Sequence, residues 1–216
     1  MNLPLEYKLL QPKTASDNPP LLVMLHGYGS DENDLFSFAD ELNQKFLVVS
    51  LKAPIKLGFG GNAWYDIEYS ANAEKWTNVS QALQSREKIL QSLDIIHKEQ
   101  NTNPQETYLF GFSQGAILGY SLSINYPQHF KGVLALSGYV DPQLLPKTLE
   151  ADKYPEYFVS HGKQDGVIPV AWARKTEKYL KENNFNFEYH EYNMEHGINP
   201  DCFSDFMNWL KKRDLL

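Results

Sequence analysis

The stretch YLFGFSQGAILGY, residues 108–120, joins two apolar segments through a serine flanked by glycines. The run 108–110 is typical of a buried strand, and the apolar series that begins at Ala116 is typical of a buried helix. Between them, Gly-Phe-Ser-Gln-Gly matches the G-x-S-x-G pattern of a nucleophile elbow, in which a strand turns sharply into a helix and exposes a serine hydroxyl. We interpret Ser113 as a candidate nucleophile. The alternative is a Gly/Ser turn in which Ser113 only caps the helix.

Strand and helix signals alternate along the rest of the chain. Uninterrupted apolar runs are typical of strands buried on both faces of a parallel sheet, and apolar stripes at helical spacing indicate the helices between them. We expect strands near 5–10, 21–25, 46–51, 107–112, 131–136, 157–160 and 185–192, and helices within 30–46, 77–101, 114–125, 170–182 and 202–212. Ser30 or Asp31 is expected to cap the first helix. This order predicts an α/β fold, with a mostly parallel central sheet and helices on both faces, in a single domain spanning 1–216.

Composition excludes several classes of partner. The net charge of −7 argues against a nucleic-acid partner, because phosphate binding needs clustered lysine and arginine. The one cysteine, Cys202, allows no intramolecular disulfide, which fits a reducing compartment. The N-terminus lacks the pattern of a signal peptide, and nothing is long and apolar enough to span a bilayer. We therefore expect a cytoplasmic protein without stable membrane insertion; the sequence leaves a homodimer open.

A serine nucleophile needs a base, and in this kind of fold the chain order is serine, acid, histidine. Four histidines follow Ser113. His129 lies in a helix-to-strand connection, expected at the other end of the sheet, and His190 lies within a strand. His161 ends a strand close to the candidate acid. His196 lies in the loop before the last helix, on the side where the serine emerges, and is the predicted base.

The acid must orient the imidazole and stabilise its charged form. Asp165, in FVSHGKQDGVIPV, comes just after a strand and is the predicted acid. Asp141, in LSGYVDPQ, also follows a strand and is the rival. Asp165 is favoured because its strand directly precedes the strand that leads to His196.

Acyl transfer also needs donors for the developing oxyanion. The backbone N–H of Gln114, the residue after the serine, is one candidate. The second is the N–H of Tyr28, in the loop LHGYGSDEND after the strand 21–25. A structural role is expected for His26 in the same loop.

The loop 52–77 is rich in glycine and aromatic residues. Its Phe59, Trp64 and Tyr65 are candidates for binding substrate, because glycines could let this segment line a groove. A satellite core built from the same aromatic side chains is an equal alternative.

Six motifs spread over nearly the whole chain are together similar to the motifs of a known family. They are LHGYGSDENDL, NAWYDI, GFSQGA, ALSGY, SHGKQDGVIP and YNMEHGI. In this order they resemble the phospholipase/carboxylesterase family of small serine esterases, which includes the acyl-protein thioesterases. The resemblance implies an α/β-hydrolase fold without a large lid. It also implies a triad of Ser113, Asp165 and His196, with Tyr28 and Gln114 as oxyanion donors.

The chain departs from the family pattern at two places. Ala116 stands where family members often have a further glycine, and no basic residue precedes Trp64 in the segment 62–66. The first departure bears on helix packing, and the second removes a charge that could have bound substrate.

The function implied is that of a carboxylesterase, which hydrolyses small-molecule esters or thioesters of short-to-medium acyl chains through an acyl-enzyme. No metal or organic cofactor is expected. An acyl-protein thioesterase or lysophospholipase acting on long acyl chains is the alternative. A non-catalytic binding module with the same fold is the alternative of another class.

Overall fold

The computed structural model describes residues 1–58, 60–69, 75–149 and 153–216. The strands of its main sheet are β1 (Tyr7–Leu10), β2 (Leu21–Leu25), β3 (Leu47–Leu51), β8 (Thr107–Phe112), β9 (Gly132–Leu136), β10 (Glu156–Gly162) and β11 (Phe187–Tyr192). Within the described ranges these seven strands lie in the order β1-β3-β2-β8-β9-β10-β11. Strand β1 runs antiparallel to β3, and each other neighbouring pair is parallel.

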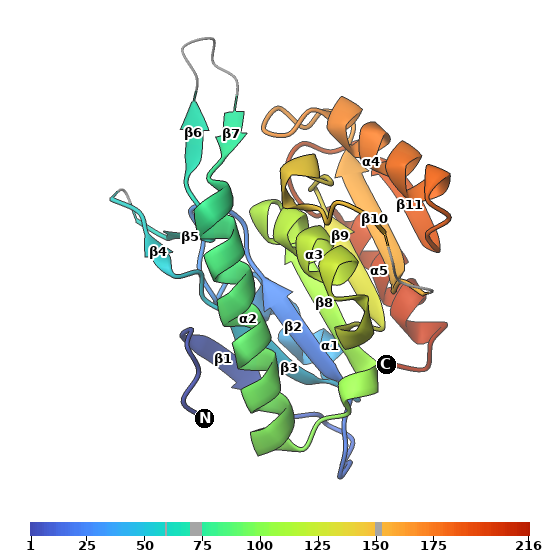
Figure 1. Ribbon diagram of the computed structural model, residues 1–216. Coiled ribbons are helices and arrows are strands. Elements are labelled where there is room, and N and C mark those ends of the chain that lie inside the picture. Colours follow the sequence, from blue (N-terminus) through green and yellow to red (C-terminus); the bar gives the residue numbers. More distant parts are fainter. Residues whose placement is uncertain (59, 70–74, 150–152) are drawn as a thin grey trace.

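Helices cover both faces of this sheet (Figure 1). They are α1 (Ala39–Leu42), α2 (Val79–Gln100), α3 (Gln114–Asn125), α4 (Val170–Glu182) and α5 (Pro200–Lys211), with short 3-10 turns η1 (Leu35–Phe38), η2 (Pro104–Glu106), η3 (Pro127–His129) and η4 (Pro142–Leu144). One hydrophobic core holds side chains of α2, α3 and α4, and a second core on the other face holds side chains of α1 and α5. The predicted α/β fold with a mostly parallel sheet is confirmed.

The apolar runs in the sequence become the central strands. Every residue of β2, β3 and β9 is buried, because helices cover both faces of the sheet at these positions. Strand β11 at the edge is only partly buried, which fits its mixed sequence FEYHEY. Burial thus follows the position of each strand in the sheet.

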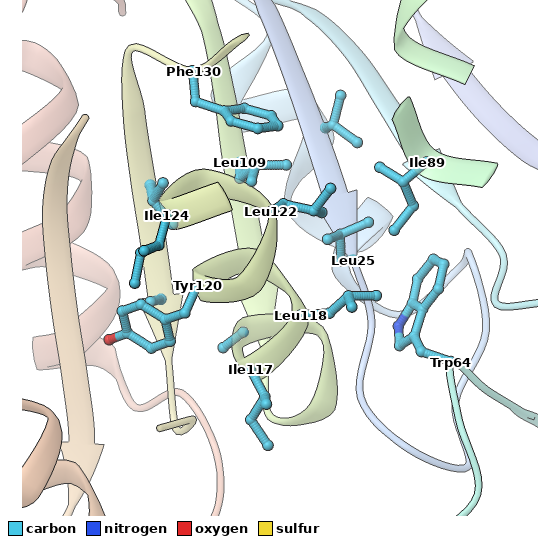
Figure 2. Close-up of a cluster of buried hydrophobic side chains, with 14 of the residues drawn as sticks. Leu25, Trp64, Ile89, Leu109, Ile117, Leu118, Tyr120, Leu122, Ile124 and Phe130 are labelled. Atoms are coloured by element: carbon cyan, nitrogen blue, oxygen red, sulfur yellow. The ribbon is translucent and has the colours of Figure 1, made fainter. Parts of the chain in front are cut away.

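Helix α3 is buried along almost its whole length, from Gln114 to Ile124. In Figure 2, Leu118 points towards Trp64, which comes from the segment between β3 and α2, whereas Ile117 points away from it. A helix that is apolar on all sides belongs inside a protein. Its position is therefore fixed from several directions, and so is the residue from which it starts.

The carboxyl ends of β2 and β8 flank the point where the strand order reverses. After β2 the chain adds β3 on one side, and it later returns to add β8 on the other side of β2. Ligands of open α/β sheets bind in the crevice at such a switch point. Tyr28 follows β2 and Ser113 follows β8, so both lie at this crevice.

Two short antiparallel hairpins occupy the segment between β3 and α2. They pair β4 (Ile55–Lys56) with β5 (Asn62–Ala63) and β6 (Ile67–Tyr69) with β7 (Lys75–Thr77). The second hairpin projects beyond the main sheet (Figure 1). Part of the predicted aromatic loop is therefore regular structure.

The helix predicted within 30–46 begins later than expected, and its predicted cap is wrong. Regular structure starts with η1, and the side chain that precedes it makes no capping hydrogen bond. Ser30 Oγ instead donates to Asp34 Oδ2 at 2.8 Å, and Asp31 Oδ1 accepts from Asn33 N at 2.8 Å. These local hydrogen bonds stabilise a turn in competition with the helix.

Replacing Gly115 by alanine is expected to destabilise the fold, because α3 passes very close to the end of β2 at this glycine. A Cβ there would stand 1.9 Å from the Leu25 carbonyl oxygen. We expect Gly115→Ala to lower the free energy of unfolding by about 2 kcal/mol or more, measured by urea denaturation. Gly58→Ala is the control, since no heavy atom lies within 4 Å of its Cβ position. Equal stability of the two variants would contradict this account.

Candidate active site

Ser113 has a strained backbone between β8 and α3. Its φ of 53° and ψ of −118° lie in a region that residues with a side chain rarely adopt. Its backbone N–H donates to the Leu136 carbonyl at 2.9 Å, which holds the turn against β9. Its side chain makes no capping hydrogen bond to α3. The hydroxyl is therefore not used to cap the helix and has another partner.

That partner is His196, and a line of hydrogen bonds continues to Asp165. His196 Nε2 lies 2.8 Å from Ser113 Oγ, and His196 Nδ1 lies 2.7 Å from Asp165 Oδ2. The carboxylate accepts from Nδ1–H, which leaves Nε2 as the nitrogen that accepts the serine proton. The side chain of Asp165 is fully buried and that of His196 is 17% exposed. The structure brings together the three residues predicted for the triad.

Two loops that follow β10 and β11 are joined through their backbones. Lys163 N donates to the Tyr192 carbonyl at 2.8 Å, and Gln164 N donates to the Met194 carbonyl at 3.1 Å. A Cβ on Gly162 would stand 2.3 Å from the Glu195 carbonyl oxygen, so only glycine allows this approach. The segment that carries the imidazole is thereby fixed against the segment that carries the carboxylate.

The Asp165 carboxylate is surrounded by donors. Oδ1 accepts from the backbone N–H groups of Val167 and Ile168, each at 2.8 Å. Oδ2 lies 2.7 Å from His196 Nδ1 and 3.2 Å from His161 Nε2. Both oxygens are therefore held in place, Oδ1 by the backbone and Oδ2 by His196.

The other candidates lie elsewhere. Asp141 Oδ2 accepts from Thr77 Oγ1 at 2.6 Å and its Oδ1 accepts from Gln143 N at 3.0 Å, so its carboxylate caps η4. His129 lies in η3. His190 lies in β11, and its ring stacks on Phe158 of β10. The hydrogen bonds described join none of these three candidates to Ser113.

The two predicted oxyanion donors lie on either side of the switch point. Gln114 is the first residue of α3, and the first N–H groups of a helix have no intrahelical acceptor. The loop with Tyr28 is held by His26, whose Nε2 accepts from Ala53 N at 3.0 Å. Burial lowers the pKa of His26, so this ring is neutral and fits the predicted structural role.

The side chain of Gln114 fixes the segment that contains Trp64. Its Oε1 accepts from Trp64 N at 2.9 Å and its Nε2 donates to the Tyr65 carbonyl at 2.7 Å. The Trp64 indole donates to the His26 carbonyl at 2.8 Å and is completely buried. The start of α3, the loop after β2 and the segment 62–66 are thus bound to one another.

A cavity of about 330 Å³ opens onto the serine hydroxyl. Its wall is mostly aromatic and aliphatic, and it consists of Tyr28, Tyr65, Ile67, Thr77, Ser113, Gln114, Ile117, Tyr139, Val167, Ile168, Trp172 and His196. Of the residues predicted to bind substrate, Tyr65 lines this cavity and Trp64 does not, while Phe59 lies outside the described residues. Tyr139 and Trp172 were missed, although LSGY and GVIPVAW place them just after β9 and at the start of α4.

A second cavity, of about 490 Å³, lies beside the first. Thr77, Tyr139 and Trp172 line both cavities and so form the wall between them. The rings of Tyr139 and Trp172 meet edge to face, with centroids 4.7 Å apart. This aromatic pair is packed in a favourable geometry.

Two tyrosines of the cavity wall stay protonated at neutral pH. Burial, with a smaller contribution from the Asp141 carboxylate, raises the pKa of Tyr139 to about 12. Burial also raises the pKa of Tyr65 well above its usual value. Both phenols are therefore donors, and neither can serve as a base near neutral pH.

In the part of the chain that the structure describes, no group of three or more His, Cys, Asp and Glu side chains is placed to hold a metal ion. In the same residues, no helix is long and apolar enough to cross a membrane.

Comparison with known proteins gives consistent results. A sequence model of the family described as Phospholipase/Carboxylesterase matches residues 11–213. Acyl-protein thioesterase 1 of Saccharomyces cerevisiae is 28% identical over 163 residues, which cover 69% of this chain and 68% of the yeast protein. A probable inactive carboxylesterase of Oryza sativa subsp. japonica is 25% identical over 160 residues, covering 69% of this chain and 62% of the rice protein. The crystal structure of esterase PE8 superimposes with a TM-score of 0.83 at 25% identity, covering 96% of this chain and 98% of that one.

Proposed function

The chain belongs to the phospholipase/carboxylesterase family, as the resemblance of its motifs predicted, and we propose that it is a carboxylesterase that acts through a covalent acyl-enzyme. Ser113 is the proposed nucleophile, His196 the base, and Asp165 the acid that orients the base. The observation that carries this proposal is the line of hydrogen bonds from Ser113 Oγ through the imidazole to Asp165, at 2.8 and 2.7 Å.

In the first step, His196 Nε2 takes the proton of Ser113 as Oγ attacks the ester carbonyl carbon. The new C–O bond gives a tetrahedral intermediate with a negative oxygen. When this intermediate collapses, the bond to the leaving group breaks, and the imidazolium gives its proton to the departing alcohol or thiol. Asp165 stabilises the imidazolium while the tetrahedral intermediate forms and while it collapses, because its carboxylate already faces Nδ1.

In the second step, water replaces the leaving group. His196 takes a proton from the water as its oxygen attacks the acyl carbon, and a second tetrahedral intermediate forms. Its collapse breaks the bond to Oγ and returns the proton from the imidazolium to the serine. The carboxylic acid product leaves, and the enzyme is regenerated.

The developing oxyanion is proposed to accept from the backbone N–H groups of Tyr28 and Gln114. Both residues line the cavity that contains Ser113. The backbone around them is fixed by Trp64 and by the side chain of Gln114, so the donors would be in place before the reaction starts. Preorganised donors of this kind make a large contribution to acyl transfer.

The cavity supports a small apolar acyl group as substrate. Its volume of about 330 Å³ is near the lower end for ligand pockets, and aromatic and aliphatic side chains predominate in its wall. Short-to-medium acyl chains fit this description. We also propose that the protein acts in the cytoplasm, as its single cysteine suggests; that cysteine, Cys202, is buried and free.

The second cavity favours one alternative, an esterase or thioesterase for long acyl chains. It continues from the first cavity behind Tyr139 and Trp172. Movement of either ring would join the two spaces and admit a longer chain. The similarity to a yeast acyl-protein thioesterase agrees with this alternative.

Ser113→Ala separates an enzyme from a non-catalytic binding module. We expect hydrolysis of p-nitrophenyl butyrate to fall by at least about 10⁴-fold, because the nucleophile is lost. A fluorophosphonate probe should label the native protein and not this variant. Ser204→Ala, at an exposed position of α5, is the matched control and should keep full activity and labelling. An unlabelled native protein would support the binding module instead.

Asp165→Asn and Asp141→Asn together identify the acid. In Asp165→Asn the amide can donate to Nδ1 and hold the imidazole in the wrong tautomer, so we expect kcat to fall by about 10⁴-fold. In Asp141→Asn we expect a loss below about tenfold, because this carboxylate bonds to Thr77 and η4. A larger loss of kcat in Asp141→Asn than in Asp165→Asn would show that the acid is misassigned.

The wall between the cavities is expected to set the acyl-chain preference. We expect native kcat/KM for p-nitrophenyl esters to peak at short or medium acyl chains. Trp172→Ala should move this peak to longer chains, with kcat/KM for long esters rising by about fourfold for each methylene newly buried. Leu145→Trp, which fills only the second cavity, should lower the ratio of dodecanoyl to butyryl ester turnover. Leu83→Trp on the exposed face of α2 is the control. If the ratio of dodecanoyl to butyryl ester turnover is the same in all three variants, the second cavity does not bind substrate. Thioesters with the same acyl chains would show whether the enzyme prefers oxygen or sulfur esters.

A further inference from the structure

His161 is a buried polar residue that the proposed reaction does not use. It lies near the end of β10, and its side chain is completely buried. It lines neither of the two cavities beside the serine. A histidine in such a position needs an explanation, because burying a polar ring is costly unless hydrogen bonds compensate.

The two ring nitrogens of His161 have different surroundings. Nε2 lies 2.8 Å from the Ile168 carbonyl oxygen and 3.2 Å from Asp165 Oδ2. Both neighbours are acceptors, so Nε2 carries the hydrogen. Nδ1 is buried and has no hydrogen-bond partner among the residues described. The ring is therefore retained for what its Nε2–H does.

The His161 ring lies next to the carboxylate oxygen that faces the proposed base. The two backbone donors to Asp165 both bind Oδ1. Oδ2 is left between two imidazoles, His196 Nδ1 at 2.7 Å and His161 Nε2 at 3.2 Å. Oδ2 thus accepts a hydrogen bond from His196 and has the polarised N–H of His161 beside it.

The same N–H fixes the loop that carries the carboxylate. It lies 2.8 Å from the carbonyl oxygen of Ile168, three residues after Asp165, and donates to it. Ile168 also lines the cavity at the serine. One donor from β10 therefore links the sheet to the cavity wall and to the loop that carries the acid.

We infer that His161 is a positioning residue for the acid–base pair: its Nε2–H holds the Ile168 carbonyl, and with it the loop that presents Asp165 to His196, and its polarised N–H moderates the negative charge on the nearby Oδ2. This inference rests on the proposed esterase function. The charged or titratable groups around the ring are Asp165 and His196 on the loop side and Glu191, its partner in the register with β11. Glu191 is paired with Arg174 of α4 at 2.7 Å.

The role has a consequence for proton transfer. A carboxylate that loses a neighbouring polarised N–H carries more uncompensated negative charge towards His196 and stabilises its imidazolium more strongly. The acidic limb of the pH profile of kcat/KM, which reports this ionisation, moves to higher pH. Loss of packing alone has no such effect.

His161→Gln and His161→Leu test the inference, with p-nitrophenyl butyrate as substrate. The glutamine amide offers an N–H at about the position of Nε2, whereas leucine offers none. We expect His161→Leu to lower kcat by about tenfold, with KM changed less than about threefold, and to move the acidic limb upwards. His161→Gln should restore most of kcat and the native pH profile. Thermal melting of each variant verifies that it is folded.

Nitrogen NMR of the native protein gives a second measurement that needs no variant. His161 should be in the tautomer with the hydrogen on Nε2, and a signal from the other tautomer would overturn the inference. Native kcat and pH profile in His161→Leu, or equal losses in both variants without a pH shift, would also overturn it. Absence of ester hydrolysis and of fluorophosphonate labelling in the native protein would instead overturn the proposed function.

Discussion

The close contact between the start of α3 and the end of β2 is the constraint on which the site depends. Gly115 lies against the Leu25 carbonyl, so α3 begins directly beside the loop after β2. Two residues earlier, at Ser113, the chain must therefore turn within a very short space, and the φ of 53° at Ser113 is the result. The same contact brings the first N–H of α3 next to the loop with Tyr28. The energetic cost of this strained backbone at Ser113 is compensated by the burial of the whole of α3.

A second contact of the same kind delivers the other two side chains together. Asp165 and His196 come from different loops, but Gly162 lets the backbones of these loops touch and exchange hydrogen bonds. Their relative position is thus set by the backbone rather than by two flexible side chains. This matters because a misplacement of about 1 Å can cost a factor of about 10² in rate. The ends of the strands and the close backbone contacts at Gly115 and Gly162 determine the geometry of the proposed triad more than the side chains themselves do.

The sequence was informative where a pattern reports a local constraint. Apolar runs identified the central strands, and the elbow pattern identified Ser113, because both depend on neighbouring residues. The roles of Ser113, Asp165 and His196, and the single domain, stay predictions. The pairing of Tyr139 with Trp172 could not be predicted, since it depends on how β9 and α4 pack. The burial of Trp64 depends in the same way on Gln114, distant in the sequence.

The proposed function assigns chemistry and substrate choice to different parts of this structure. The residues of the proposed triad lie on loops bound to one another and to the central strands. The wall between the cavities is built from Tyr139, Trp172 and Thr77; the two rings pack on each other, and Thr77 donates to Asp141. A change in that wall alters the space for the acyl group without removing a hydrogen bond of the triad. His161 lies on the other side of this division, because it holds the loop of Asp165 through the Ile168 carbonyl and lies beside the carboxylate. The same sheet can therefore keep one reaction while the cavity beside it changes to fit different acyl chains.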